Sequence, residues 1–415
     1  MSKIINYIDL FAGAGGLSEG FLADGYSPVA HVEMSEYACA TLRTRICYYY
    51  CKNNNMMEKY NDYLRGVIKR KDLFNSVPSH LLDTVINDTM SNDTLPSIFE
   101  KIDNLKKENN ISEVDLIIGG PPCQAYSIIG RSRQENGMHG DPRNYLYKLY
   151  CKFLSKYKPK AFVFENVPGL LSANNGLYLK NMQADFDKIG YRTDLNILDA
   201  SEFGVLQKRC RIILIGWRKE ENFSYPDFPK IIHKYTVKDL LSDLPSIKPS
   251  EENNKYKSTK YSNYLLEHGI RNHADVLTWN IARPHLNRDI EIYKRVITAW
   301  KTEHRRLKYT DLPSELCTHN NRTAFLDRFK VVADDLPACH TIVAHLSKDG
   351  HYFIHPDIEQ ARSITVREAA RIQSFPDNYY FEGPRTAAFT QIGNAVPPVM
   401  ANGIAKQIRK DFFKE

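Results

Sequence analysis

The segment that decides the fold is Asp9-Leu10-Phe11-Ala12-Gly13-Ala14-Gly15-Gly16-Leu17. Residues 7–11 are apolar enough to predict a buried strand, the glycines predict a tight turn, and residues 18–23 predict a helix. Glycine-rich turns let the backbone pass close beneath a ligand at the start of a helix. The segment therefore predicts the first strand–turn–helix unit of an α/β protein.

Further strand-like runs follow at residues 29–33, 115–118, 160–165 and 212–217, and a helix is expected from Tyr37 onward. Alternating strands and helices predict an α/β fold with a doubly wound, mostly parallel sheet. The alternation fades after Trp217, so we expect a first domain over residues 1–222 and a second, smaller one over 223–385. Residues 386–415 are expected to complete the first domain.

Two more elements are expected in the second half of the chain. Residues 340–346 and 351–355 flank a Lys348-Asp349-Gly350 turn signal and predict the two strands of a hairpin. Residues 365–374 predict an amphipathic helix. The four histidines of the hairpin, and Cys47 with Cys51, are weak candidates for metal ligands, and we expect no metal.

Composition limits the possible classes of function. The chain has 415 residues and a formal net charge of +7, which suits a polyanionic partner without proving one. No apolar run is long enough to span a membrane, and the beginning of the chain lacks a signal-peptide pattern. Eight scattered cysteines then indicate reduced thiols in a cytoplasm. The basic, tyrosine-rich stretch 45–71 either binds nucleic acid or covers the core as a solvated helical face.

A carboxylate is expected beside the glycine turn. Glu33 ends the second predicted strand, 20 residues after Gly13. A carboxylate at that place accepts hydrogen bonds from ribose hydroxyls. The dinucleotide fingerprint would need a glycine where Ser18 stands, so a nucleoside without phosphates fits better than NAD. An NAD-dependent oxidoreductase remains an alternative at the level of the fold.

A cysteine follows another predicted strand, in Gly119-Gly120-Pro121-Pro122-Cys123-Gln124. The prolines fix φ and the glycines allow close backbone approach, so the thiol is held at a strand end, where open α/β sheets bind ligands. Such a thiol is a candidate nucleophile. A lone cysteine is more often simply buried in a turn.

Together, six motifs in order resemble the DNA (cytosine-5) methyltransferase family of bacterial restriction-modification systems. They are the glycine turn at 9–17, the Pro-Cys-Gln loop at 120–127, Phe164-Glu165-Asn166-Val167, Gln207-Lys208-Arg209-Cys210-Arg211, the block 365–376, and Gln391-Ile392-Gly393-Asn394-Ala395-Val396-Pro397-Pro398. The resemblance implies the S-adenosylmethionine-dependent methyltransferase fold with a second, smaller target-recognition domain. It also implies methyl transfer to carbon 5 of a flipped-out cytosine in double-stranded DNA.

The resemblance assigns a catalytic role to four residues. Cys123 is expected to add to the ring carbon next to carbon 5, and Glu165 to supply a proton or hydrogen bond at ring nitrogen 3. Arg211 is expected to hold the exocyclic oxygen, with Arg209 supporting charge on the loop or a phosphate. The residues expected at S-adenosylmethionine are Phe11, Gly13, Gly15, Gly16, Leu17, Glu33, Met34, Asp88, Thr89, Asn394 and Val396.

Three departures from the family pattern stand out. Asn87-Asp88-Thr89 replaces a more usual Gly-Asp-Ile, the stretch 45–71 is an insertion, and Ile129 stands where some members have a serine that enters the DNA. The loop from Gln124 to Arg143 contains three glycines and is expected to close over the flipped base.

The segment from about 223 to 360 lies where the family reads its DNA target. Candidate base-reading residues there are Arg271, Asn272, His273, Arg283 and Arg322. The expected partners are double-stranded DNA and a cognate restriction endonuclease, for a monomer in a bacterial cytoplasm, on the nucleoid. RNA cytosine-5 methylation and a catalytically silent DNA-binding role are the alternatives.

Overall fold

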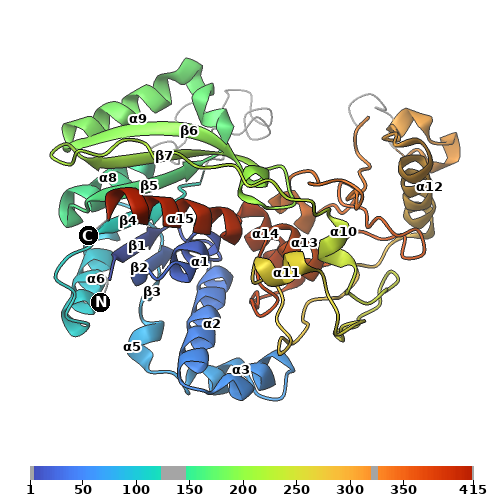
Figure 1. Ribbon diagram of the computed structural model, residues 1–415, viewed down its shortest axis with the longest axis horizontal. Coiled ribbons are helices and arrows are strands. Elements are labelled where there is room, and N and C mark those ends of the chain that lie inside the picture. The colour runs from blue at the N-terminus through green and yellow to red at the C-terminus, as the bar shows by residue number, and fades with distance from the viewer. Residues whose placement is uncertain (1–3, 123–145, 319–325, 414–415) are drawn as a thin grey trace.

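The computed structural model describes residues 4–122, 146–318 and 326–413 (Figure 1). Cys123, the loop from Gln124 to Arg143, with Ile129 in it, and Arg322 lie outside these ranges. No helix of the described ranges is both long and apolar enough to cross a membrane.

A seven-stranded sheet forms the centre of the first half of the chain, with the strand order β3-β2-β1-β4-β5-β7-β6. The strands are β1 (Asn6–Leu10), β2 (Ser27–Glu33), β3 (Val85–Asn87), β4 (Leu116–Gly119), β5 (Ala161–Asn166), β6 (Tyr191–Asp199) and β7 (Cys210–Arg218). Neighbours from β3 to β5 are parallel, whereas β7 runs antiparallel to both β5 and β6. The predicted α/β class with a mostly parallel, doubly wound sheet is confirmed.

Helices cover both faces of this sheet, because its strands are apolar on both sides. Within β1, Tyr7 belongs to one core and Ile8 to the other, as the two-residue period of a strand requires. The helices α1 (Gly16–Ala23) and α15 (Pro398–Phe412) pack on the Tyr7 face. The Ile8 face is covered by α6 (Leu95–Glu108), α8 (Leu146–Tyr157) and α9 (Leu177–Lys188).

The insertion at 45–71 begins within α2 (Glu36–Asn53), which starts directly after β2 and runs back toward the amino ends of the strands. It continues through α3 (Met57–Leu64) and α4 (Arg70–Phe74), followed by α5 (Ser79–Leu82), at the lower edge of Figure 1. Tyr63 and Arg70 both donate hydrogen bonds to the carboxylate of Glu382. These bonds hold the insertion against the segment after α13. Of the two interpretations, packing against the core is the one that these contacts support.

A second core lies beside the sheet, built from the chain after residue 236. Its helices are α10 (Lys238–Leu241), α11 (Asn263–Glu267), α13 (Val366–Ile372) and α14 (Arg385–Asn394). Ala14 of the glycine turn and Leu206 belong to the same core, so it continues into the first half of the chain. The helix α12 (Asn287–Glu303) packs on a separate small cluster with Phe329, at the right of Figure 1.

Short 3₁₀ segments connect the larger elements. They are Pro168–Leu171, Ala173–Gly176, Ala200–Phe203, Tyr309–Asp311, Ser314–Leu316 and Ala344–Ser347. The last of these occupies part of the predicted histidine hairpin.

The prediction of a hairpin over residues 340–346 and 351–355 is wrong. Residues Ala344–Ser347 form a 3₁₀ turn, and Arg283 donates to the carbonyl of Leu346. His340 is bonded to the carbonyl of Tyr352 instead of lying in a ladder. Tertiary contacts therefore take up the polar groups that strand pairing would have needed. Within the described ranges, no three His, Cys, Asp or Glu residues gather as metal ligands.

Candidate active site

The glycine turn after β1 has one open part and one packed part. A Cβ at Gly13 would meet no atom within 4 Å, whereas a Cβ at Gly16 would lie 2.4 Å from the carbonyl oxygen of Val396. Leu17 is buried in the core of the sheet. Gly13 therefore leaves open space at the turn, while Gly15, Gly16 and Leu17 shape the turn and dock it against the last motif. Phe11 is partly buried and packs against the core on the Ile8 face of the sheet.

The carboxylate of Glu33 fixes the shape of this turn. One oxygen accepts the backbone N–H of Gly13 at 2.9 Å, and the other accepts that of Ser35 at 2.8 Å. A carboxylate has about four acceptor positions, so two N–H donors leave it able to accept from hydroxyl groups as well. The structure thus brings together the turn and the acid that the sequence paired by spacing.

A second carboxyl group, Asp9, lies beneath the turn. Its side chain is 1% exposed, and its Oδ2 has no hydrogen-bond partner in the described part of the chain. Burial, together with the nearby charge of Glu33, raises the pKa of Asp9 well above its usual range. Both effects favour the protonated form of this carboxyl group. Sequence analysis quoted it within the motif and gave it no role.

The ends of β2 and β3 meet beside Glu33. The N–H of Asp88 donates to the carbonyl of Glu33 at 3.1 Å, and the Asn87 side chain donates to the carbonyls of Glu33 and Met34. Met34 is 64% exposed, and the Asp88 carboxylate accepts the N–H of Thr89. Glu33, Met34, Asp88 and Thr89 therefore lie together, as the parallel pairing of β2 with β3 requires.

This set of groups fits a nucleoside that carries no phosphate. Glu33 and Asp88 are acceptors that suit ribose hydroxyls and an exocyclic amine, and they would repel phosphate charges. Gly13 leaves room at the turn, and Met34 offers an apolar surface. Asn394 is exposed at the end of α14, two residues before the Val396 carbonyl that contacts the turn.

An ion pair occupies the ends of β5 and β7. Arg211 Nε lies 2.7 Å from Glu165 Oε1, and the two side chains are 13% and 12% exposed. The antiparallel pairing of these strands places Asn166 opposite Ile212, so the carboxyl end of β5 meets the beginning of β7. The structure therefore brings together two predicted catalytic residues that are 46 positions apart in the chain.

The chain that leads to Cys123 starts from this ion pair. A Cβ on Gly120 would lie 2.5 Å from Glu165 Oε2, so only glycine allows this close approach. Asn166 donates through Nδ2 to the carbonyl of Pro121 at 3.3 Å, which ties the beginning of the loop to β5. Cys123 follows two residues later in the chain and lies outside the described ranges.

Arg209 does not have the surroundings expected of a catalytic group. It is fully buried, and its guanidinium donates to the carbonyls of Ile342 and Gly393 at 2.6 and 2.9 Å. These bonds join the beginning of β7 to the second core and to α14. The geometry makes Arg209 a positioning residue, because a guanidinium enclosed by backbone carbonyls cannot also reach a phosphate.

The candidate base-reading residues divide into two groups. Arg271 is buried in an ion pair with Asp243 and stacks 3.6 Å from the ring centroid of Tyr256. Arg283 donates a hydrogen bond to the carbonyl of Leu346. Arg271 is therefore not available for a base edge, and its prediction is corrected. Arg283 is half-buried, and its base-reading role stays a prediction. Asn272 and His273 are exposed.

The family model described as C-5 cytosine-specific DNA methylase matches residues 5–66 and 66–410 of this chain. A type II methyltransferase of Bacillus paralicheniformis, M.Bpa9945I, is 44% identical, over 97% of this chain and 98% of its own length. The type II methyltransferase M.AgeI of Thalassovita gelatinovora is 29% identical, over 97% and 98%.

Solved structures show the same fold. A prophage-encoded protein of E. coli, solved as a candidate DNA modification methyltransferase, has a TM-score of 0.64 at 23% identity and covers 99% of this chain and 100% of its own. The Dnmt2 methyltransferase of S. pombe has a TM-score of 0.53 at 14% identity, over 98% and 99%. At these identities the likeness concerns the fold alone.

Proposed function

The chain belongs to the C-5 cytosine-specific DNA methylase family, and we propose that its Glu165–Arg211 pair holds the target cytosine while the thiol of Cys123 attacks it. Its activity is transfer of a methyl group from S-adenosylmethionine to carbon 5 of cytosine in DNA, as in type II restriction-modification. The observation that supports the catalytic assignment is the meeting of Glu165, Arg211 and the start of the Cys123 loop at the adjoining ends of β5 and β7.

The cysteine is needed because carbon 5 of cytosine is a weak nucleophile. The neighbouring ring carbon that the Cys123 thiolate attacks shares a double bond with carbon 5. When the carbon–sulfur bond forms, the electrons of this double bond move toward carbon 5 and ring nitrogen 3. Carbon 5 then accepts the methyl group that S-adenosylmethionine supplies. A water molecule then takes the proton from carbon 5 and the bond to sulfur breaks, which restores the aromatic ring and the thiolate.

Glu165 and Arg211 act on the charge that this addition creates. Glu165 supplies a proton or hydrogen bond to ring nitrogen 3, and Arg211 donates to the exocyclic oxygen. Their ion pair holds both side chains at the strand ends before a base arrives, which lowers the cost of ordering them. The cytosine leaves the duplex to reach them, because a stacked base is inaccessible.

The residues proposed to hold S-adenosylmethionine lie around the glycine turn. Glu33 accepts from the ribose, Asp88 from the adenine amine, and Gly13 makes room for the amino-acid tail. Phe11, Met34, Thr89 and Asn394 border this place, and Gly15, Gly16, Leu17 and Val396 hold its shape.

Residues 223–385 are proposed to read the DNA site, in a monomer that protects the site of a cognate endonuclease. The exposed Asn272 and His273 fit a base-reading role. As an enzyme whose substrate is DNA, it would work on the nucleoid, in the cytoplasm. Light scattering of the purified protein tests the monomer, and challenge of modified DNA with restriction enzymes tests the protection.

The decisive experiment compares wild type with Cys123→Ser. Label from S-adenosylmethionine should enter cytosine-rich duplex DNA with wild type and fall by at least about 10³-fold with the variant, because the serine hydroxyl is a far weaker nucleophile. Bisulfite sequencing of DNA from expressing cells gives the recognition sequence. Equal transfer by the variant would refute the assignment of Cys123, and preferential labelling of tRNA would refute the DNA substrate.

A further inference from the structure

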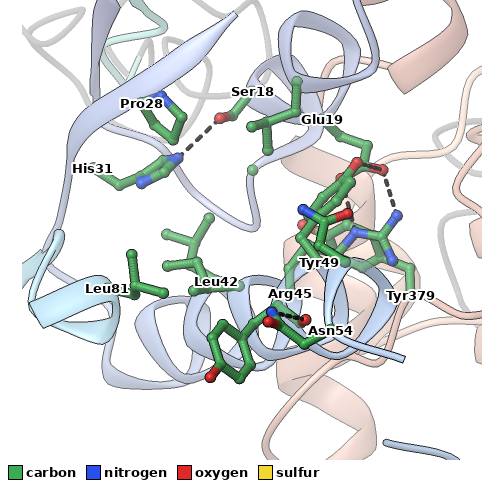
Figure 2. A pocket seen from close by; sticks show the side chains of 15 residues that line it. Ser18, Glu19, Pro28, His31, Leu42, Arg45, Tyr49, Asn54, Leu81 and Tyr379 are labelled. Carbon is green, nitrogen blue, oxygen red and sulfur yellow. Dashed lines mark hydrogen bonds and ion pairs between the residues drawn. The ribbon is translucent and has the colours of Figure 1, made fainter. Parts of the chain in front are cut away.

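A cavity of about 240 Å³ lies between α1, β2 and α2 (Figure 2). Its walls are mainly apolar and include Leu42, Pro28 and Leu81. The cavity extends along α2 toward Asn54, away from Ser35, where that helix begins beside Glu33. Gly15 lines the cavity from the inner side of the glycine turn, but the rest of the cavity lies away from the proposed S-adenosylmethionine site at the carboxyl ends of the strands.

One buried residue of the cavity wall, His31, has a ring nitrogen without a hydrogen-bond partner among the described residues. His31 is 2% exposed and lines the cavity, and its Nδ1 has no hydrogen bond to any residue that the structure describes. Its other ring nitrogen, Nε2, lies 2.9 Å from Ser18 Oγ (Figure 2). Buried imidazole nitrogens are nearly always hydrogen-bonded, so this exception needs an explanation.

The neighbours of His31 determine which nitrogen carries the proton. Ser18 Oγ is hydrogen-bonded to both His31 Nε2 and the fully buried hydroxyl of Tyr7. If Tyr7 donates to Ser18 and Ser18 donates to Nε2, both hydroxyl protons are used. The reverse direction would leave the Tyr7 proton without an acceptor, which is costly in a buried place. The imidazole proton therefore lies on Nδ1, as a donor that is not engaged by the described residues.

The cavity offers no net charge to a ligand. Burial lowers the pKa of His31 to about 4, so the ring is neutral at neutral pH. Glu19 and Arg45, the charged residues of the wall, form a buried ion pair with each other. Tyr49 also donates to Glu19 at 2.9 Å, and Arg45 donates to the Asn378 side chain at 2.8 Å. An ion would enter without a counter-charge and would lose its hydration.

We propose that this cavity is a binding site for a small, uncharged, mainly apolar molecule with one hydrogen-bond acceptor, which takes the N–H of His31 Nδ1. A dry cavity of about 150 Å³ is enough to bind benzene, so a substituted aromatic ring fits the space here. An aryl ketone has the required shape and acceptor. The apolar ring would contact Leu42 and Leu81, and the carbonyl oxygen would meet His31.

The test is calorimetric titration of the full chain with three probes of similar size. Acetophenone carries the acceptor, cumene has nearly the same shape without it, and benzoate adds a charge. We expect saturable one-site binding of acetophenone, with cumene about tenfold weaker and benzoate weaker still, because only acetophenone satisfies the N–H without a charge.

Variants separate this site from unspecific uptake. Leu81→Trp fills the cavity and should abolish acetophenone binding, whereas Leu266→Trp, at a 56% exposed position on α11, should leave it unchanged. His31→Phe should remove the preference for acetophenone over cumene. Should that variant not fold, Ser18→Ala replaces it, because it removes the donor that fixes the imidazole proton on Nδ1, and the preference should again fall.

Three results would overturn the proposal. One is the absence of saturable acetophenone binding to wild type, which would mean that water alone occupies the cavity. Another is equal acetophenone affinity in wild type and Leu81→Trp. The third is equal affinity of wild type for acetophenone and cumene.

Discussion

Two carboxylate–guanidinium groupings of this molecule have the same chemistry and opposite surroundings. At the strand ends, Glu165 and Arg211 share one short contact and keep about an eighth of their side-chain surface exposed. In the second core, Arg371 lies between Asp243 and Asp377, and the three side chains are at most 1% exposed. The first grouping is accessible to a substrate and the second is sealed.

The number of bonds explains the difference. Arg371 donates to both oxygens of Asp243, to both oxygens of Asp377 and to the carbonyl of Leu240. Every donor group of this guanidinium is used, so it can only hold the segments together. Arg211 uses Nε on Glu165 and Nη1 on the carbonyl of Cys210, and among the described residues none bonds its Nη2. An ion pair with unused donors can rearrange around a substrate, whereas a saturated one cannot.

The comparison predicts that Arg371→Met mainly affects stability. Two buried carboxylates would lose their main partner, so the free energy of unfolding should fall by about 3–5 kcal/mol. Urea unfolding measures it. The matched control is Arg295→Met, which breaks an exposed pair with Glu291 on α12 and should change the free energy of unfolding by at most about 0.5 kcal/mol. A loss below about 1 kcal/mol for Arg371→Met would contradict the structural role.

Glu165→Gln should instead mainly affect methyl transfer and leave the free energy of unfolding nearly unchanged. The amide cannot donate a proton to the ring, so single-turnover methyl transfer should slow by on the order of 10²–10⁴-fold. The free energy of unfolding should change by less than about 1 kcal/mol, because the position is partly solvated. Glu202→Gln, which removes an exposed partner of Lys230, is the control with unchanged transfer. If Glu165→Gln lowered the free energy of unfolding as much as Arg371→Met does, both groupings would be structural, which would contradict the comparison.

Acid should act on the sealed region through His355, which lies 3.5 Å from Glu368. Burial lowers the pKa of His355 from 6.5 to about 4. The unfolded chain therefore binds a proton before the folded one, and stability present above pH 6.5 is lost as the pH falls toward 4. His355→Gln should reduce this loss by on the order of 2 kcal/mol, measured by urea unfolding at several pH values. An unchanged pH dependence would show that His355 titrates normally.

Gly120→Ala should show how tightly the active-site pair is packed. The new Cβ would lie 2.5 Å from Glu165 Oε2 and would displace the carboxylate. We expect methyl transfer to fall about tenfold, with S-adenosylmethionine affinity unchanged because Glu33 and Gly13 lie elsewhere. Rapid-quench kinetics and calorimetry measure the two quantities. Wild-type transfer rates would mean that the position of the carboxylate is not critical.

The fold was predictable where strands are apolar on both faces. The runs at 29–33, 115–118, 160–165 and 212–217 became β2, β4, β5 and β7 with small changes at their ends. Sequence analysis did not name β6, because its side chains alternate between exposed and half-buried along an edge of the sheet. The direction of β7 was not predictable either, because an apolar run has the same pattern in a parallel strand and in an antiparallel one.

The candidate site was predictable where a residue follows a strand directly. Glu33 and Glu165 occupy the strand ends at which they were expected. Arg271 and Arg283 were assigned from residue type, and Arg209 from its place in a family motif. All three donate to carbonyls or carboxylates of the protein. An arginine in a sequence does not reveal whether its partner is a substrate or the chain itself.

The sequence by itself determined the family, the chemistry and the strand ends that carry it, because these depend on short motifs and on local periodicity. Only the tertiary structure decided which charges face a substrate and which are sealed. That choice depends on partners far away in the chain: Glu165 meets Arg211 through antiparallel strand pairing, and Arg371 meets Asp243 through the packing of the second core. Burial and the number of available partners arise only once the chain is folded, and they separate the active-site pair from the structural one.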